Sequence, residues 1–169
     1  MTCAIAFAQP KSDSRIADLL NDLASTRQFA DVAISPDGAR VAWVDDAKAE
    51  IYVKTIASGA PVRIASGRKI AWSPDSTRLA FLSDDKQPQL CVVAAKGGKA
   101  RKLTTLTGYL TDPQWSPDGS KIAILFAENA AGGGGPLEAE PVETGVIGGE
   151  IHNQRLTVVD AASGVVKQI

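Results

Sequence analysis

The chain alternates between short apolar runs and polar turns, and one arrangement of the two occurs three times. In each copy an apolar run ends in Ile34, Trp72 or Trp115, and a polar turn comes directly after it. A basic residue comes shortly after the turn, and four apolar residues in succession come after the basic one. An uninterrupted apolar run, in place of alternation, is typical of a strand that is covered on both faces. The pattern therefore predicts strands that lie between neighbouring sheets.

The turns between these strands share the sequence Ser-Pro-Asp. Pro presets φ for the second position of a type I turn, Asp suits the third, and Gly takes the φ > 0 position that leads into the next strand. Ser76 replaces this Gly in the second copy, so we expect slight backbone strain there. The predicted structural turns consist of Ser35, Pro36, Asp37 and Gly38, then Ser73, Pro74 and Asp75, and finally Ser116, Pro117, Asp118 and Gly119.

The spacing of the turns predicts the fold class. The second copy begins 38 residues after the first, and the third begins 43 residues after the second. A period of about 40–45 residues is typical of a four-stranded propeller blade. We therefore expect an all-β fold, a partial β-propeller of three four-stranded antiparallel blades over residues 29–169. The expected blades are 29–66, 69–107 and 113–169.

Individual strands can be placed from the turn residues around them. The first blade is expected to contain Asp31–Ser35, Ala39–Asp45, Glu50–Ile56 and Pro61–Ala65. The third strand is expected at Gln89–Ala94 in the second blade and at Gln154–Asp160 in the third, where Val165–Ile169 comes after it. We expect the aromatic rings to fill the layers between blades, and the residues concerned are Trp43, Trp72, Phe81 and Trp115.

The third repeat carries an insertion of about 23 residues at about 127–149, between its second and third strands. The insertion is acidic, and no Lys or Arg occurs between Lys121 and Arg155. Long loops on a rigid scaffold often bind ligands, and an acidic loop attracts cationic groups such as the free amino terminus of a peptide. The candidate substrate-gating residues are therefore Glu138, Glu140, Glu143 and Glu150. The alternative is a solvated loop without a binding role.

The residues before the first blade form a different region. Residues 11–28 are expected to contain a short helix, Ser12–Ser25, whose apolar positions follow the 3.6-residue period and dock on the first blade. Residues 1–10 resemble the end of a signal peptide, in which Ala6-Phe7-Ala8 fits a cleavage site. We interpret them as a residual signal peptide or a disordered tail, and the first interpretation predicts a periplasmic or secreted protein.

Composition excludes several classes of partner. The 169 residues are 44% hydrophobic and 22% charged and carry a net charge of −1, which is typical of a globular protein. The balanced charge gives no reason to expect a nucleic-acid partner, and no apolar run is long enough to insert in a membrane as a helix. Of the two cysteines, Cys3 and Cys91, we expect the second to be a small buried strand residue.

The chain lacks the motifs of a catalytic centre. It contains no Gly-x-Ser-x-Gly nucleophile elbow and no Cys-x-x-Cys pair, and its one histidine is His152. We expect His152 to be a surface strand residue, with a general base as the alternative. Gly132–Gly135 is expected to be a hinge and lacks the Lys that a phosphate loop needs. The sequence thus predicts no catalytic residue, no cofactor and no metal site, and leaves open whether the chain is part of an enzyme.

The number of repeats bears on the completeness of the ring. Propellers close with about four to eight blades, and three are predicted here. We therefore expect an N-terminal fragment whose partners include the missing blades. The alternatives are a short protein that completes its ring by oligomerising and the product of a pseudogene.

The repeats resemble the WD40-like repeats of TolB-type periplasmic proteins and of the prolyl oligopeptidase (S9) family. Three further segments are similar to exported dipeptidyl and acylaminoacyl peptidases of the S9 family. These segments are Ala17–Leu23, Gly135–Pro141 with Thr144–Ile147, and Asn153–Lys167. The resemblance covers about residues 18–169.

The resemblance implies a function that the residues alone do not. In the S9 family a propeller precedes a C-terminal α/β-hydrolase domain with a Ser-Asp-His triad, covers the active site and excludes large folded substrates. The resemblance therefore implies a non-catalytic propeller fragment of an exported serine peptidase, which controls peptide access to a hydrolase domain outside this chain. The alternative is a TolB-like periplasmic propeller that acts as a protein-binding module.

Overall fold

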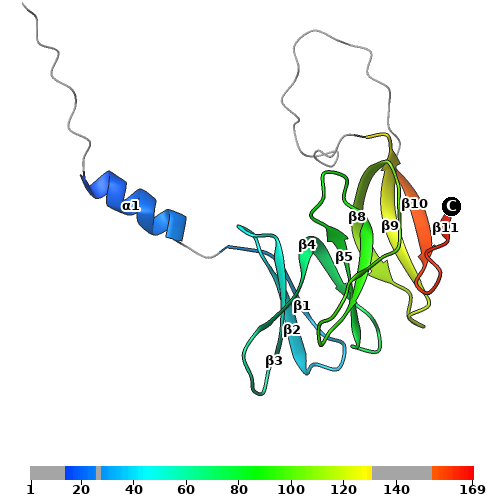
Figure 1. Cartoon of the computed structure of the whole chain (residues 1–169), viewed down its shortest axis with the longest axis horizontal. Helices are drawn as coiled ribbons and strands as arrows, with labels where there is room; N and C mark the ends of the chain where they lie inside the picture. Colours follow the sequence, from blue (N-terminus) through cyan, green and yellow to red (C-terminus); the bar gives the residue numbers. More distant parts are fainter. Residues whose placement is uncertain (1–13, 26–27, 131–153) are drawn as a thin grey trace, which may run out of the picture.

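The computed structural model describes residues 14–25, 28–130 and 154–169, which form one helix and two antiparallel sheets (Figure 1). Helix α1 spans Ser14–Ser25 and extends away from the sheets. Its apolar side chains Ile16, Leu19 and Leu23 are 58%, 61% and 65% exposed. The expected docking of this helix on the first repeat is therefore wrong for this structure.

The first sheet has seven strands in the order of the sequence, and each strand pairs antiparallel with the next. Short polar turns join consecutive strands, which explains this simple topology. The strands are β1 (Phe29–Ile34), β2 (Arg40–Asp45), β3 (Glu50–Thr55), β4 (Val62–Trp72), β5 (Arg78–Ser83), β6 (Leu90–Ala94) and β7 (Arg101–Lys102).

The second sheet has four strands and belongs to the third repeat. Its order is β8-β9-β10-β11, so that β9 pairs with β10 although the insertion separates them in the sequence. The strands are β8 (Gly108–Trp115), β9 (Lys121–Glu128), β10 (Gln154–Asp160) and β11 (Val166–Gln168).

Strand β4 is the main departure from the expected three separate sheets. Its first half pairs with β3 up to Ser66, and its second half pairs with β5 from Gly67 onward. No turn interrupts the chain at this junction, so one extended strand joins the first two repeats into a single sheet. Gly67 permits the crossing, because a Cβ atom there would lie 2.3 Å from the carbonyl oxygen of Leu82.

Two hydrophobic cores lie between the repeats, and β5 contributes to both. Leu79 and Phe81 point into the core shared with the first repeat, whereas Ala80 and Leu82 point into the core shared with the third. Coverage on both faces is therefore confirmed for β5. The same expectation is wrong for β2 and β9, in which buried residues alternate with half-buried ones. Each of these strands has a described neighbouring repeat on one face.

The aromatic residues divide in the same way. Trp72 and Phe81 are buried in the first core, and Trp115 packs against the second. Trp43, expected in such a layer, lies instead on the outer face of β2, where its ring stacks on that of Tyr52 with centroids 5.7 Å apart. Nothing in the described part of the chain covers this face.

Candidate functional site

The three Ser-Pro-Asp turns share one hydrogen-bond pattern. The Ser hydroxyl donates to the Asp carboxylate, at 2.5 Å between Ser73 and Asp75 and at 2.6 Å between Ser116 and Asp118. The same hydroxyl oxygen accepts the backbone N–H of the basic residue five positions on, at 2.9 Å from Arg78 and Lys121. These contacts close each turn and start the next strand in the same register.

The turn carboxylates are stabilised in their charged form. The Ser73 hydroxyl, followed by the backbone N–H of Thr77, lowers the pKa of Asp75 from 3.8 to about 2. The Ser116 hydroxyl and the backbone N–H of Ser120 do the same for Asp118. The Ser35 hydroxyl lowers the pKa of Asp37. Each carboxylate is committed to its own turn, which gives it a structural role.

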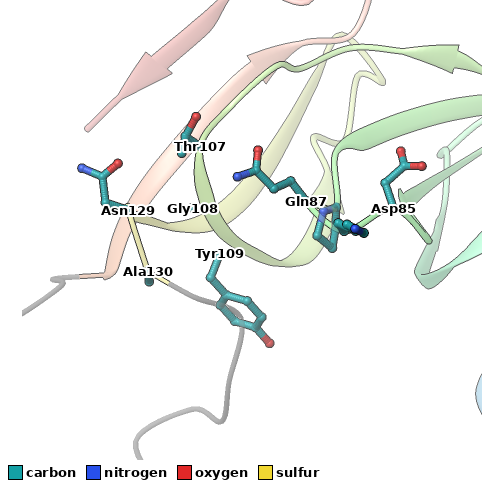
Figure 2. A pocket seen from close by; sticks show the side chains of 9 residues that line it. Asp85, Gln87, Thr107, Gly108, Tyr109, Asn129 and Ala130 are labelled. Carbon is teal, nitrogen blue, oxygen red and sulfur yellow. The ribbon is translucent and has the colours of Figure 1, made fainter.

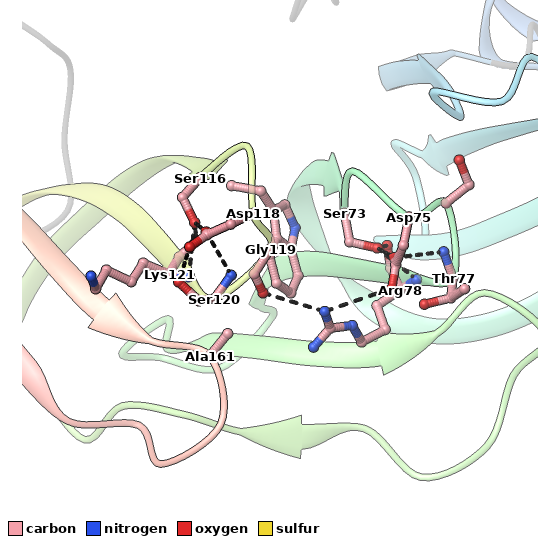
Figure 3. Close-up of polar contacts among 12 residues, drawn as sticks. Ser73, Asp75, Thr77, Arg78, Ser116, Asp118, Gly119, Ser120, Lys121 and Ala161 are labelled. Atoms are coloured by element: carbon pink, nitrogen blue, oxygen red, sulfur yellow. Dashed lines mark hydrogen bonds and ion pairs between the residues drawn. The ribbon is translucent and has the colours of Figure 1, made fainter.

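Neighbouring turns are also joined to each other. The Arg40 guanidinium donates to the carbonyl oxygen of Ser76 at 2.8 Å, and the hydroxyl oxygen of Ser76 accepts the N–H of Asp37 at 3.0 Å. In the next pair, the Arg78 guanidinium donates to the carbonyl oxygen of Gly119 at 3.3 Å (Figure 3). It also lies 4.7 Å from the ring centroid of Trp115. The basic residue of one repeat thus holds the turn of the next.

A second link between repeats runs along their first strands. Asp31, Lys69 and Asp112 each lie four residues before the Ser of their turn. The Asp31 carboxylate accepts the backbone N–H of Lys69 at 2.8 Å. The Lys69 ammonium lies 3.8 Å from the Asp112 carboxylate. Charged groups of alternating sign therefore line up across the three repeats at this position, which the sequence pattern did not predict.

The four candidate gating residues, Glu138, Glu140, Glu143 and Glu150, lie outside the described residues, as do His152 and the glycines 132–135. The described chain approaches the insertion at Ala130, after β9, and resumes at Gln154, where β10 begins. The insertion therefore attaches at the end of the second sheet opposite the Ser-Pro-Asp turn.

A pocket of about 520 Å³ lies at this end of the sheets, between the β5–β6 loop and the start of β8. Thr107, Tyr109 and Asn129 line one side, and Asp85 and Gln87 come from the loop opposite (Figure 2). The lining offers hydroxyl, amide and carboxylate groups. The volume of the pocket lies within the range of ligand-binding sites in proteins, and it lies beside the attachment point of the insertion.

The wall of this pocket is fixed by Gln89, which is 3% exposed. Its side-chain oxygen accepts the N–H of Leu106 at 2.8 Å and the hydroxyl of Thr104 at 2.9 Å. Its side-chain nitrogen donates to the carbonyl oxygen of Leu106 at 2.7 Å. A buried and satisfied amide of this kind holds two segments in one arrangement. A lone Gln before an apolar strand gave no sequence signal for this role.

Among the described residues the structure contains no group of His, Cys, Asp and Glu side chains suited to a metal ion. Cys91 is buried, as expected, and burial raises the pKa of its thiol, which disfavours the thiolate that a nucleophile needs. No helix in the described part of the chain is long and apolar enough to cross a membrane.

Comparison with known proteins gives one family and two groups of relatives. The profile of the family described as PD40, TolB beta propeller domain, matches residues 23–136. The chain is 33% identical over 121 residues to the uncharacterized peptidase YuxL of Bacillus subtilis, an alignment that covers 63% of this chain. It is 36% identical over 124 residues to the Tol-Pal system protein TolB of Bordetella pertussis, covering 69% of this chain.

Among solved structures, the acylaminoacyl peptidase of Pyrococcus horikoshii aligns with a TM-score of 0.63 and 16% identity, covering 88% of this chain and 26% of that one. At this identity the likeness shows a shared fold. The chain spans 18% of the length of YuxL and 27% of the length of the Bordetella TolB.

Proposed function

Because the chain belongs to the PD40 family of TolB-type β-propeller domains, we propose that it is the part of a peptidase propeller that controls the access of peptides to a hydrolase domain. In this proposal residues 29–169 supply three four-stranded blades. The division of the pairings of β4 between Ser66 and Gly67 supports this assignment, because it leaves four strands in each repeat. The chain is related both to peptidases and to TolB, and the peptidase YuxL supports the first relationship.

One observation carries the gating role. The acidic insertion leaves the second sheet at Ala130, a residue that also lines the pocket between the β5–β6 loop and β8. An acidic segment that is attached beside such a pocket attracts the ammonium group of a peptide and raises its local concentration. In the proposal Glu138, Glu140, Glu143 and Glu150 provide this attraction, while the pocket accepts the adjoining backbone.

The test uses the longer polypeptide that contains this chain and its hydrolase. Replacing the four glutamates by lysine is expected to raise KM for a peptide with a free amino terminus about tenfold, with kcat little changed. The same peptide with an acetylated amino terminus serves as the matched control, since it carries no charge to attract. A KM that stays constant for the free peptide, or that rises equally for both peptides, contradicts the gating role.

A TolB-like protein-binding module is the second candidate. The 36% identity over 124 residues to the Bordetella TolB supports it. The two candidates differ in the residues that they require beyond Ile169 in the same reading frame. A peptidase requires a Gly-x-Ser-x-Gly motif in a later α/β-hydrolase domain, whereas a binding module ends soon after its ring closes. Reading the coding sequence onward, together with an assay of the purified product on acylated and free peptides, separates the two.

The proposed site of action is the periplasm or the exterior of the cell. Ala6-Phe7-Ala8 supports export, because small residues around one intervening position are typical of a signal-peptide cleavage site. Fractionation of cells that express the tagged protein tests this proposal. Recovery of the protein in the cytoplasmic fraction alone contradicts it.

A further inference from the structure

A second pocket, of about 430 Å³, lies between the first and second repeats at the end of the sheets that carries the Ser-Pro-Asp turns. This is the opposite end of β5 from the pocket beside the insertion, since Thr77 precedes β5 and Asp85 comes after it. The two sites are therefore independent. The lining combines the start of β2 and the β3–β4 loop of the first repeat with Thr77, Ala95 and Lys96 of the second.

The chemistry of this pocket is that of an anion site with an apolar floor. Arg40 and Lys96 supply two positive charges, and Thr55, Ser58 and Thr77 supply hydroxyl groups. No carboxylate of the described residues lines the pocket. The remaining lining is small and apolar and consists of Val53, Ala60, Val62 and Ala95, with Gly59 beside them.

The two cations of this pocket keep donors for a ligand. Neither Arg40 nor Lys96 forms an ion pair with a carboxylate of the described residues. Asp37 is close enough to be influenced by the charge of Arg40, but it is held by the Ser35 hydroxyl and the Ala39 N–H. The Arg40 guanidinium is oriented by its bond to the carbonyl oxygen of Ser76, which uses one of its nitrogen atoms. A planar guanidinium with free donors and a nearby ammonium matches a carboxylate.

A comparison with the interface between the second and third repeats explains why a pocket is present between the first and second repeats. Equivalent positions can be read from the strand registers, in which Val62 pairs with Val53 of β3 and Arg101 pairs with Val92 of β6. Arg101 reaches the third repeat and donates to the carbonyl oxygens of Ala161 and Ala162. The equivalents of these two residues in the second repeat are Ala95 and Lys96, because Ala95 N donates to Thr77 O as Ala161 N donates to Ser120 O.

At the first interface the short side chain of Val62 takes the place of this long arginine. It leaves the space beside Ala95 and Lys96 unfilled, and Lys96 adds a positive charge where the third repeat has Ala162. The first interface therefore lacks the residue that bridges the second interface, and it gains a cation. Neither change is needed to hold the repeats together, since Arg40 and Trp72 already bond across this interface, to Ser76 O and Ala33 O.

From this arrangement we propose that the pocket between the first two repeats binds a carboxylate group attached to a small apolar moiety, such as the carboxyl terminus of a peptide ending in alanine. Arg40 and Lys96 bind the carboxylate, Thr55 donates to its remaining lone pairs, and Val53 and Val62 contact the apolar moiety. The site is separate from the proposed gating role of the insertion and does not depend on it.

The test titrates the full 169-residue chain with N-acetyl-Ala-Ala, with the carboxamide of the same dipeptide, and with acetate, and monitors backbone amide resonances by NMR. The free dipeptide is expected to shift the amides of Ala60 and Lys96 in a saturable manner, whereas the carboxamide is not. Acetate identifies the source of the carboxylate: binding as tight as that of the dipeptide supports a small free acid, and weaker binding supports a peptide terminus. Equal binding of the carboxamide and the free dipeptide overturns the proposal.

Two variants sharpen the test. Val62→Arg reproduces the arginine of the second interface and is expected to fill the pocket and abolish binding, although it adds a positive charge. Tighter binding by this variant overturns the proposal, because it is the result expected of unspecific attraction.

Lys96→Gln is expected to weaken binding of the dipeptide about tenfold. Its matched control is Lys48→Gln in the exposed β2–β3 turn, which removes the same charge at the far end of the sheet and leaves the affinity unchanged. An equal loss in the two glutamine variants also overturns the proposal.

Discussion

At the scale of the residue, Ser76 combines a strained backbone conformation with a stabilising hydrogen bond, and the sequence predicts only the strain. It occupies the position held by Gly in the other two turns and adopts φ of 58°, a conformation that costs a non-glycine residue about 1 kcal/mol. In return its buried hydroxyl oxygen accepts the N–H of Asp37 in the preceding turn. The predicted strain is present, and the compensating bond was beyond sequence analysis because its partner is 39 residues away.

Two variants of Ser76 separate these effects. Ser76→Ala keeps the strained φ and loses the hydrogen bond, so we expect the free energy of unfolding to fall by about 1 kcal/mol. Ser76→Gly loses the same bond but relieves the strain, so we expect it to be within about 0.5 kcal/mol of the parent chain. Denaturant titrations of the three proteins measure both values. A glycine variant less stable than the alanine variant contradicts this balance.

The turn aspartates predict how stability depends on pH. Folding lowers the pKa of Asp118 from 3.8 to about 2, so the folded chain binds fewer protons than the unfolded chain in this range. The resulting stabilisation is fully present above pH 3.8 and is lost as the pH falls towards about 2. Asp118→Asn keeps an oxygen acceptor for the Ser120 N–H but does not titrate. Its free energy of unfolding is expected to vary less with pH in this window than that of the parent, and an identical slope contradicts the assignment.

At the scale of the element, each junction between repeats contains a glycine in the strand that begins the next repeat, Gly67 in β4 and Gly108 in β8. Gly67 pairs with Ser83 at the end of β5, and Gly108 pairs with Glu128 at the end of β9, so each glycine lies opposite the end of the second strand of its repeat. A Cβ atom at Gly108 would lie 2.2 Å from the carbonyl oxygen of Ala127. Real Cβ atoms do not approach backbone oxygens so closely, so either strand must move to admit a side chain.

Gly108→Ala is therefore expected to destabilise the chain by about 2 kcal/mol or more, through overlap with the backbone as well as an unfavourable φ. Gly98→Ala is the matched control. Gly98 also has a positive φ, 124°, but no described atom lies within 4 Å of its Cβ position, so the φ effect alone remains and costs about 1 kcal/mol. Thermal unfolding monitored by circular dichroism compares the two. Equal losses show that backbone overlap adds nothing at Gly108.

Strand positions could be predicted well because turn residues and apolar runs are local signals. The third strand of the third repeat, expected at Gln154–Asp160, is β10 with these bounds. The continuity of β4, the Gln89 network and the pocket beside Val62 depend on contacts between repeats, which a local pattern does not contain. The insertion contributes the proposed gating charges, and its four glutamates fall outside the described residues, so the sequence remains the basis for them.

At the scale of the whole molecule, the structure is a row of three repeats with unequal ends. The outer face of the first repeat exposes Phe29, Val32 and Ile34, each by more than half, around the half-buried Trp43. The third repeat exposes Leu156 and Val165 at the other end. The middle repeat alone has described neighbours on both faces, which is why four residues in each of β5 and β6 are buried. Exposed apolar faces of this kind are typical of surfaces that associate with another protein surface.

The continuity of β4 has a consequence for how the row comes apart. Strand β4 runs unbroken from its pairing with β3 into its pairing with β5, whereas the second and third repeats are connected by the non-strand segment 103–107. The first two repeats should therefore open as one cooperative unit, and the third should open separately at lower free energy. Native-state hydrogen exchange measures this directly: amides of β2 and β5 are expected to exchange with one common opening energy, above that of β9. A common energy for all three strands contradicts this order and assigns the row to a single unfolding unit.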